Sequence, residues 1–275
     1  MDTGRVDFLY LDEKDMIKAG VLNMHKCINE MENVFKLLSE EDYIMGGSND
    51  NSHGMLIDFP DNPVHPSMPK NGPDRRFMAM PAYLGGEYRV CGCKWYGSNI
   101  ENIPNGLPRS ILMMTINNAD TGAPLTFQSA NLLSAWRTGA IPGVGAKYLA
   151  NPDSKTFGVV GAGAIGTSST EAIIDAVPTL EEIKIYDIYL PTAEILEERL
   201  NDEYPELNVK IVDTMEEAIK DSDVVNLATS GEANPKIENE WISPGTLFTV
   251  SATADFDPDF AINNMKFVVD NWKMY

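Results

Sequence analysis

Short apolar runs alternate with amphipathic stretches through the second half of the chain. Runs rich in β-branched residues occupy 156–160, 183–187, 208–212, 224–228, 247–250 and 267–269, and helical patterns occupy 168–176, 192–202 and 215–220. Strands separated by helices require crossover connections and a mostly parallel sheet that is covered on both faces. This half of the sequence therefore predicts a Rossmann-type, doubly wound α/β domain.

The first half of the chain has a less regular pattern. Apolar residues spaced three and four apart predict one amphipathic helix over 13–39, and a further helix is expected over 129–150. Strand-like segments lie between them at 76–80, 88–94, 111–116 and 124–127, and a loop rich in Pro and Gly covers 61–74. We therefore expect a mixed α+β domain over residues 1–128 and the α/β domain over residues 129–275.

The turn after the 156–160 strand carries the motif Gly161-Ala-Gly-Ala-Ile-Gly166. Glycines at these positions permit a tight turn, close approach of the backbone to a pyrophosphate, and close packing of the next helix. Asp187 ends the following strand, about 20 residues after the last glycine, as in a dinucleotide-binding fingerprint. Its carboxylate can accept both ribose hydroxyls but repels a 2′-phosphate, so the pattern predicts NAD rather than NADP. Predicted cofactor contacts are Gly161, Gly163, Ala164, Ile165, Gly166 and Asp187, together with Thr138, Thr229 and Ser230.

Composition narrows the classes of partner. The chain has 41 acidic and 21 basic residues and a net charge of −20, which argues against nucleic acid or an anionic membrane as a partner. We see no apolar run long enough to span a bilayer and no signal peptide, so we expect a cytoplasmic protein. The three cysteines and three histidines have no metal-ligand or nucleophile spacing. We therefore predict no metal site.

Four cationic side chains stand out in this acidic chain. Arg75, Arg76, Lys94 and Arg137 lie within or beside apolar stretches. A buried cation is costly unless it meets an anion, and Arg can bind a carboxylate through two parallel hydrogen bonds. They are candidates for binding a substrate carboxylate, with internal ion pairs as the alternative.

Several motifs, taken together, are similar to those of one protein family. They are Met80-Pro-Ala-Tyr-Leu84, Gly92-Cys-Lys94, Gly106-Leu-Pro108, Asp120-Thr-Gly-Ala-Pro-Leu125, Leu132-Leu-Ser-Ala-Trp-Arg-Thr138 and the glycine turn. In these motifs the chain resembles the ornithine cyclodeaminase and μ-crystallin family, which also includes archaeal-type alanine dehydrogenases, ketimine reductases and some opine-forming dehydrogenases. The resemblance runs along most of the chain.

The resemblance implies roles for particular residues. Lys94 and Arg137 match the family's lysine and arginine that bind the substrate carboxylate, and Lys94 is also a catalytic candidate. Arg76 is the best match for a further arginine of that group, with Arg75 as the alternative. Asp255 matches the family's catalytic acid, although Val250-Ser-Ala-Thr-Ala-Asp255 lacks the usual glycines. Independently of the resemblance, Asp255 follows a strand's carboxyl end, where the substrate crevice of such a domain should lie.

The resemblance also implies a small amino acid as substrate and a homodimer joined through the domain over 1–128, which would bind substrate. We rank ornithine cyclodeaminase first: L-ornithine is converted to L-proline and ammonia through hydride transfer and an imine. The alternatives are an alanine dehydrogenase, ketimine reductase or opine-type dehydrogenase acting on another substrate, and a binding protein that has lost the chemistry. Because the chain ends just after the last expected strand, we expect that a C-terminal segment completing the first domain is absent.

Overall fold

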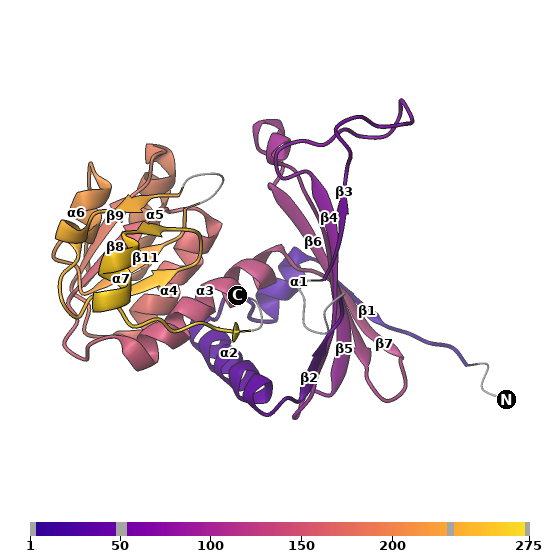
Figure 1. The fold of residues 1–275 in the computed structure, drawn as a ribbon. Helices are drawn as coiled ribbons and strands as arrows, with labels where there is room; N and C mark the ends of the chain where they lie inside the picture. Colours follow the sequence, from indigo (N-terminus) through magenta and orange to yellow (C-terminus); the bar gives the residue numbers. More distant parts are fainter. Residues whose placement is uncertain (1–3, 48–53, 230–233, 273–275) are drawn as a thin grey trace. The chain divides into compact units, whose positions relative to one another are not determined.

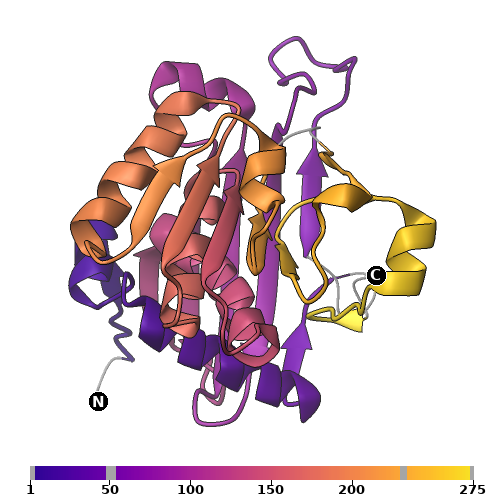
Figure 2. The same ribbon diagram turned by 90° about the vertical axis from the view of Figure 1, so that its left-hand side faces the viewer.

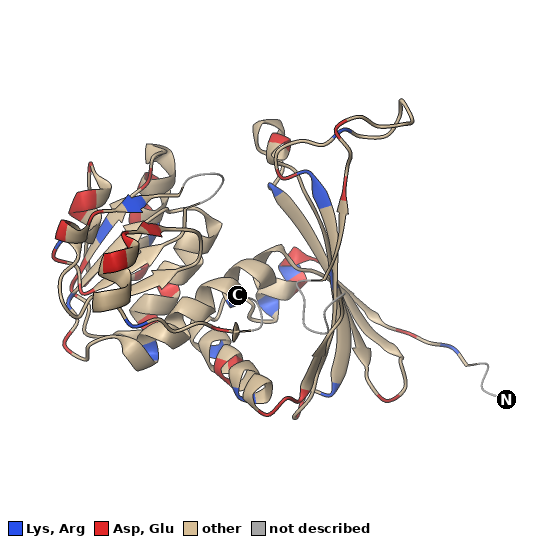
Figure 3. Cartoon of the chain, viewed as in Figure 1, with Lys and Arg blue, Asp and Glu red and all other residues tan. Residues whose placement is uncertain are grey.

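The structure is a computed structural model that describes residues 4–47, 54–229 and 234–272. Internal contacts divide the chain into two compact units, which differ in architecture (Figure 1). The first unit is drawn from Met1–Leu22, Asn33–Ser134 and Asn271–Tyr275, and the second from Asn23–Glu32 and Ala135–Asp270. Acidic residues are spread over both units (Figure 3).

The second unit is built on a five-stranded parallel sheet (Figure 2). Its strands lie in the order β10 (Asn208–Ile211), β9 (Glu182–Tyr186), β8 (Thr156–Val160), β11 (Val224–Leu227) and β13 (Leu247–Val250). Read along the chain, this is the order 3-2-1-4-5, which reverses direction between β8 and β11. Ligands of doubly wound sheets bind outside the strand ends at such a reversal. The predicted Rossmann-type sheet is confirmed.

Helices and one pair of short strands complete the second unit. The helices are α2 (Met24–Ser39), α3 (Asn131–Leu149), α4 (Ala164–Ala176), α5 (Leu190–Glu203), α6 (Met215–Ile219), α7 (Pro258–Asn264) and the 3-10 turn η2 (Asn239–Trp241); α2 and α3 each begin in one unit and end in the other. Two residues of β12 (Lys236–Ile237) pair in parallel with β14 (Asp255–Phe256).

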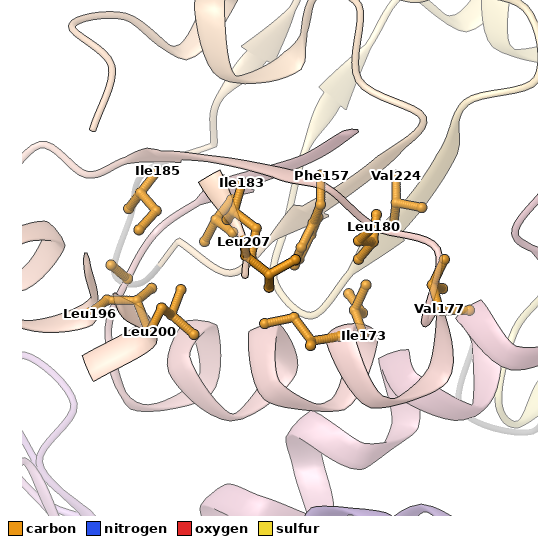
Figure 4. Packing of buried hydrophobic residues seen from close by; sticks show 14 of the residues in the cluster. Phe157, Ile173, Val177, Leu180, Ile183, Ile185, Leu196, Leu200, Leu207 and Val224 are labelled. Atoms are coloured by element: carbon orange, nitrogen blue, oxygen red, sulfur yellow. The ribbon is translucent and has the colours of Figure 1, made fainter. Parts of the chain in front are cut away.

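The core of the second unit lies between the sheet and its helices (Figure 4). Phe157, Ile183 and Ile185 of the central strands are fully buried against Ile173 of α4 and Leu196 of α5. Burying one such side chain contributes about 1.5–3 kcal/mol. Parallel strands covered on both faces read as continuous apolar runs, which is why the five strands of this sheet could be predicted from the sequence.

The first unit is built on a seven-stranded mixed sheet. The strand order is β1 (Leu9–Leu11), β7 (Pro124–Ser129), β6 (Ser110–Asn118), β5 (Val90–Ser98), β4 (Arg76–Leu84) and β2 (Tyr43–Met45), and β3 (Met55–Asp58) also pairs with β4. All pairs are antiparallel except β1 with β7. Helix α1 (Glu13–Lys18) and the 3-10 turn η1 (Ile100–Asn105) complete this unit, and the mixed α+β class predicted for it is confirmed.

Two predicted elements are wrong. The single helix expected over 13–39 is two helices, because α1 ends at Lys18 and Gly20 takes a φ of 91° that an L side chain rarely adopts. Residues 267–269 form no strand, and Phe267 and Val268 are exposed rather than buried in the sheet. A β-branched run predicts a strand only where a neighbouring strand pairs with it. No helix in the described ranges is long and apolar enough to cross a membrane.

Candidate active site

The glycine turn at the carboxyl end of β8 is packed too tightly for side chains at two of its positions. Gly161 has a φ of 94°, and a Cβ built on it lies 2.8 Å from the backbone of Ala228. A Cβ on Gly166 lies 1.9 Å from the carbonyl oxygen of Gly161. Both contacts bring the start of α4 directly against the ends of β8 and β11, where the strand order reverses.

Gly163 differs from these two glycines because a Cβ there meets nothing within 4 Å. It caps α4 without a side-chain hydrogen bond, so no capping side chain covers the first N–H groups of the helix. Gly163 and Ala164 are exposed, and Ile165 is half-buried. The turn therefore presents an open helix N-terminus, which favours an anion such as a pyrophosphate.

Asp187 lies beside this turn and is already engaged with it. Its Oδ2 accepts a hydrogen bond from the N–H of Ala162 (2.7 Å), and its Oδ1 accepts one from the N–H of Tyr189 (2.8 Å). An ionised carboxylate has about four acceptor sites, so two remain for further donors. Asp187 thus fixes the glycine turn and retains the capacity to accept ribose hydroxyls.

Thr229 follows β11 and contributes a second polar group at this end of the sheet. Its Oγ1 is buried and has no hydrogen-bond partner among the residues that the structure describes. A buried hydroxyl without a partner is costly, so a ligand that hydrogen-bonds to it is stabilised. Ser230, the other residue expected here, lies outside the described residues.

Arg137 and Thr138 are placed by a close crossing of α3 and α4. A Cβ on Gly139 lies 2.4 Å from both the backbone carbon and the Oγ of Ser168, and Ser168 Oγ donates to the carbonyl of Ala135 (2.9 Å). The absence of a side chain at Gly139 is what allows this approach. Since α4 starts at the glycine turn, the crossing fixes Arg137 and Thr138 relative to that turn.

A buried ion pair stabilises the same helix contact. Glu171 of α4 is 4% exposed and pairs with Arg199 of α5, whose guanidinium lies 5.6 Å from the ring centroid of Trp136 on α3. Burial raises the pKa of Glu171 to about 7, against the lowering effect of Arg199, and the nearby Glu203 raises it further. Burial also raises the pKa of Cys27, in spite of Arg137, so this thiol is suited to packing rather than to nucleophilic attack.

Asp255 lies in the short strand β14, after the loop that leaves β13. The N–H of Asp255 donates to the carbonyl of Pro235 (3.0 Å), and the Asp255 side chain is exposed. Asp257 instead caps α7: its Oδ1 accepts a hydrogen bond from the N–H of Phe260 (2.7 Å). Asp255 therefore has an accessible carboxylate beyond the carboxyl end of a sheet strand.

In the first unit, Arg76 and Lys94 lie on the same face of the sheet. Arg76 is opposite Ser98 and Met80 is opposite Lys94, so both cations occupy positions of equal parity on neighbouring strands. The ammonium of Lys94 lies 5.2 Å from the ring centroid of Tyr96. Arg75 precedes β4 and is occupied elsewhere, by Glu101 (2.5 Å) and the carbonyl of Lys70 (3.0 Å).

Asp74, which pairs with Arg76, and Arg109, which pairs with Asp74, were not among the predicted site residues. Asp74 Oδ1 lies 2.5 Å from Arg76 Nη1, and Asp74 Oδ2 lies 3.3 Å from Arg109 Nε. The position of Arg109 directly after the Gly106-Leu-Pro108 motif was the only available signal. Within the described ranges, no group of three or more His, Cys, Asp or Glu side chains is arranged to hold a metal ion.

A parallel sheet of this order with a glycine turn at its reversal defines a Rossmann-type nucleotide-binding protein. A model of the ornithine cyclodeaminase/mu-crystallin family matches residues 21–262, and the chain belongs to that family.

The proteins that are similar to this chain are named for different activities. The chain is 25% identical to N-((2S)-2-amino-2-carboxyethyl)-L-glutamate dehydrogenase of Staphylococcus aureus, over 97% of this chain and 75% of that protein. It superposes on Thermococcus litoralis Δ1-pyrroline-2-carboxylate reductase in complex with NADH and L-proline, with a TM-score of 0.74 and 27% identity over 88% of this chain and 68% of that one. It also superposes on an archaeal alanine dehydrogenase dimer with bound NAD, with a TM-score of 0.72 and 26% identity over 88% of this chain and 66% of that one.

Proposed function

We propose that this protein is an NAD-dependent oxidoreductase that acts on the carbon–nitrogen bond of an amino or imino acid. The observation that carries the proposal is the open glycine turn between β8 and β11, with Asp187 and the unpartnered Thr229 hydroxyl beside it. Family membership and the NADH or NAD named in two similar structures support this cofactor.

The residues present fit a dinucleotide. Gly161, Gly163, Ala164, Ile165 and Gly166 would hold the pyrophosphate through backbone N–H groups, and Asp187 would accept the adenosine ribose hydroxyls. Thr138, Thr229 and Ser230 are proposed contacts for the rest of the cofactor. When bound, NAD supplies a hydride acceptor beside the substrate carbon.

The substrate is proposed to be held by its carboxylate. Lys94, Arg76 and Arg137 are the proposed contacts, and the shared sheet face of Arg76 and Lys94 supports Arg76 over Arg75. Charge-assisted hydrogen bonds from these cations fix the substrate so that its amine-bearing carbon has one orientation. Asp255 is the proposed base that accepts a proton from the amine as the carbon–nitrogen double bond forms.

The fate of that imine separates the candidate reactions. In ornithine cyclodeamination, the δ-amine of ornithine attacks the imine carbon, ammonia leaves, and the hydride returns to give proline without net NADH. In an alanine-dehydrogenase-like or opine-type reaction, water attacks instead, so a 2-oxo acid and an amine form with one NADH. Ornithine also needs a carboxylate for its second ammonium, yet at the start of β4 Asp74 and Glu101 are already paired with arginines, and Asp58 lies opposite Arg76. This favours net oxidation, and the glutamate derivative named for the staphylococcal relative belongs among the substrates to test.

We propose a homodimer in which the domain over 1–128 forms the interface and binds substrate, while residues 129–275 bind NAD. The opposite face of the first-unit sheet supports this. It exposes Phe77 and Trp95, whose rings stack at 5.6 Å between centroids, along with Met55, Ile57 and Met113. An apolar patch of this kind is typical of an interface, and one similar structure is a dimer.

The test follows ammonia and NADH together, with NAD⁺ and L-ornithine, L-alanine or an N-(carboxyalkyl)-L-glutamate in turn. We expect NADH in proportion to the amine or ammonia released from one of these substrates. Ammonia and proline without NADH would instead establish ornithine cyclodeamination. If no amino acid reacts and no imine is reduced by NADH, the proposed function is wrong.

A further inference from the structure

Two guanidinium groups in the first unit share one carboxylate. Asp74 contacts Arg76 on Oδ1 and Arg109 on Oδ2, and no third acidic side chain is recorded on either arginine within the described residues. These three groups carry one net positive charge among themselves. Asp58 is the cross-strand partner of Arg76, but its side chain is exposed and forms no recorded ion pair with Arg76 among the described residues. Figure 3 shows basic and acidic residues together at the end of the sheet where β4 and β6 begin.

The cluster is rigidly built. Asp74 holds a φ of 54°, which is unfavourable for a residue with a side chain, and its side chain is 18% exposed. Ser98 Oγ donates to Asp74 Oδ2 (2.5 Å), and Ser110 Oγ lies 3.0 Å from Ser98 Oγ. Because Asp74 is oriented from the sheet below it, the two guanidiniums that it holds are oriented as well.

Arg76 retains hydrogen-bonding capacity that the protein does not use. Its Nε is buried and has no partner among the described residues, while the side chains of Arg76 and Arg109 are 36% and 43% exposed. A guanidinium presents five N–H donors in a planar fork that matches a carboxylate. The exposed parts of the two guanidiniums and their surplus charge both favour an anion.

This anion site is separate from the position of Lys94. Arg76 is paired with Ser98, and Lys94 is paired with Met80, which lies four residues further along β4. At a strand rise of ~3.3 Å per residue, these two backbone positions are about 13 Å apart. The Lys94 ammonium lies beside the ring of Tyr96, whose cross-strand pair with Met78 lies between those two pairs. The same sheet face therefore offers two cationic positions.

We propose that Arg109, together with Arg76, binds a second carboxylate of the substrate, so that the substrate is an amino or imino acid with two or more carboxylates. This rests on the proposed function but divides its cations: Lys94 and Arg137 contact the carboxylate next to the reacting carbon, and Arg76 is reassigned to the second carboxylate. A diamine such as ornithine would place its second ammonium against the surplus positive charge, which disfavours it.

The test is ligand binding by the full chain in the presence of NADH, with which an amino acid substrate cannot turn over. Titration calorimetry compares N-(1-carboxyethyl)-L-glutamate, which has three carboxylates, with L-alanine and L-ornithine, which have one. We expect Arg109→Gln to weaken binding of the tricarboxylate about tenfold or more, since a charge-assisted hydrogen bond is lost, and to change alanine binding less than twofold. Arg109→Lys should retain part of the affinity.

Arg89→Gln is the matched control, because Arg89 forms an exposed pair with Asp120 (2.7 Å) away from this cluster. Equal weakening of all three ligands by Arg109→Gln, or no change in any, would overturn the proposal. Wild-type protein that binds alanine or ornithine but not the tricarboxylate would overturn it while leaving the proposed function standing. Wild-type protein that binds none of the three and reduces no imine would overturn both.

Discussion

The two sheets of this protein differ in what their faces do. In the second unit, helices cover both faces of the parallel sheet, and its central strands are buried except for half-buried residues at the ends of β8 and β9. In the first unit, one face of the mixed sheet carries Arg76 and Lys94, and the other exposes Phe77 and Trp95. A sheet covered on both faces can bind ligands only at its strand ends, whereas a sheet with two open faces can use one for a ligand and one for a partner.

The largest expected effect concerns Asp255, which lies beyond the carboxyl end of β13 in the second unit. Asp255→Asn should lower kcat by about a thousandfold, because an amide cannot accept the amine proton. The affinity for NAD⁺ should change little, since Asp255 lies outside the glycine turn. Steady-state kinetics and calorimetry measure the two quantities. Undiminished turnover would show that another group is the base.

Two adjacent residues of β5 test the two faces of the first unit. Lys94→Met should raise the KM for the amino acid by about 10- to 100-fold, since it removes a charge-assisted hydrogen bond. Its sedimentation coefficient should match the wild type. Trp95→Glu should lower the sedimentation coefficient to that of a monomer and leave the KM nearly unchanged, because it places a charge in the proposed dimer face. Sedimentation of Trp95→Glu as a dimer would locate the interface elsewhere.

Asp187→Asn tests the cofactor preference assigned to the second unit. The amide can still accept one backbone N–H, but it neither repels a 2′-phosphate nor binds the ribose hydroxyls as strongly. We expect the affinity for NAD⁺ to fall about tenfold. The ratio of NAD⁺ affinity to NADP⁺ affinity should fall by more than this factor. The two nucleotides are titrated side by side. An unchanged ratio would remove Asp187 from the ribose site.

The crossing of α3 and α4 can be tested with two glycines of the same helix. Gly139→Ala should lower the free energy of unfolding by about 1–3 kcal/mol, because the new methyl group meets the Ser168 backbone. Gly145→Ala is the control: a Cβ there meets nothing within 4 Å, so it should stabilise α3 by up to about 1 kcal/mol. Chemical denaturation measures both. Equal effects would mean that the two helices do not touch at Gly139.

The smallest expected effect is a pH dependence from Glu171. Its pKa is about 7 in the folded protein, above its ordinary value of 4.5, so the folded state binds a proton that the unfolded chain has lost. Stability should therefore fall as the pH rises from about 4.5 to 7, by roughly 1–3 kcal/mol. Glu171→Gln should flatten this slope in denaturation series at several pH values. A slope unchanged by the substitution would assign it to other groups.

The sequence predicted the second unit better than the first for physical reasons. Buried parallel strands give continuous apolar runs, and the glycine turn has a fixed spacing to Asp187, so both could be read directly. The break at Gly20 was missed because the apolar spacing continues across it, and the short edge strands β1, β2 and β3 are too brief for a period to emerge. Arg109 was missed because its relation to Asp74 depends on cross-strand register, which no local pattern encodes.

The most direct test of the proposed cofactor is a titration of the purified protein with NAD⁺ and, separately, NADP⁺. The prediction is saturable binding of one NAD⁺ per chain, with NADP⁺ at least about tenfold weaker because Asp187 repels its 2′-phosphate. Absence of NAD⁺ binding, or equal affinity for the two nucleotides, would contradict it.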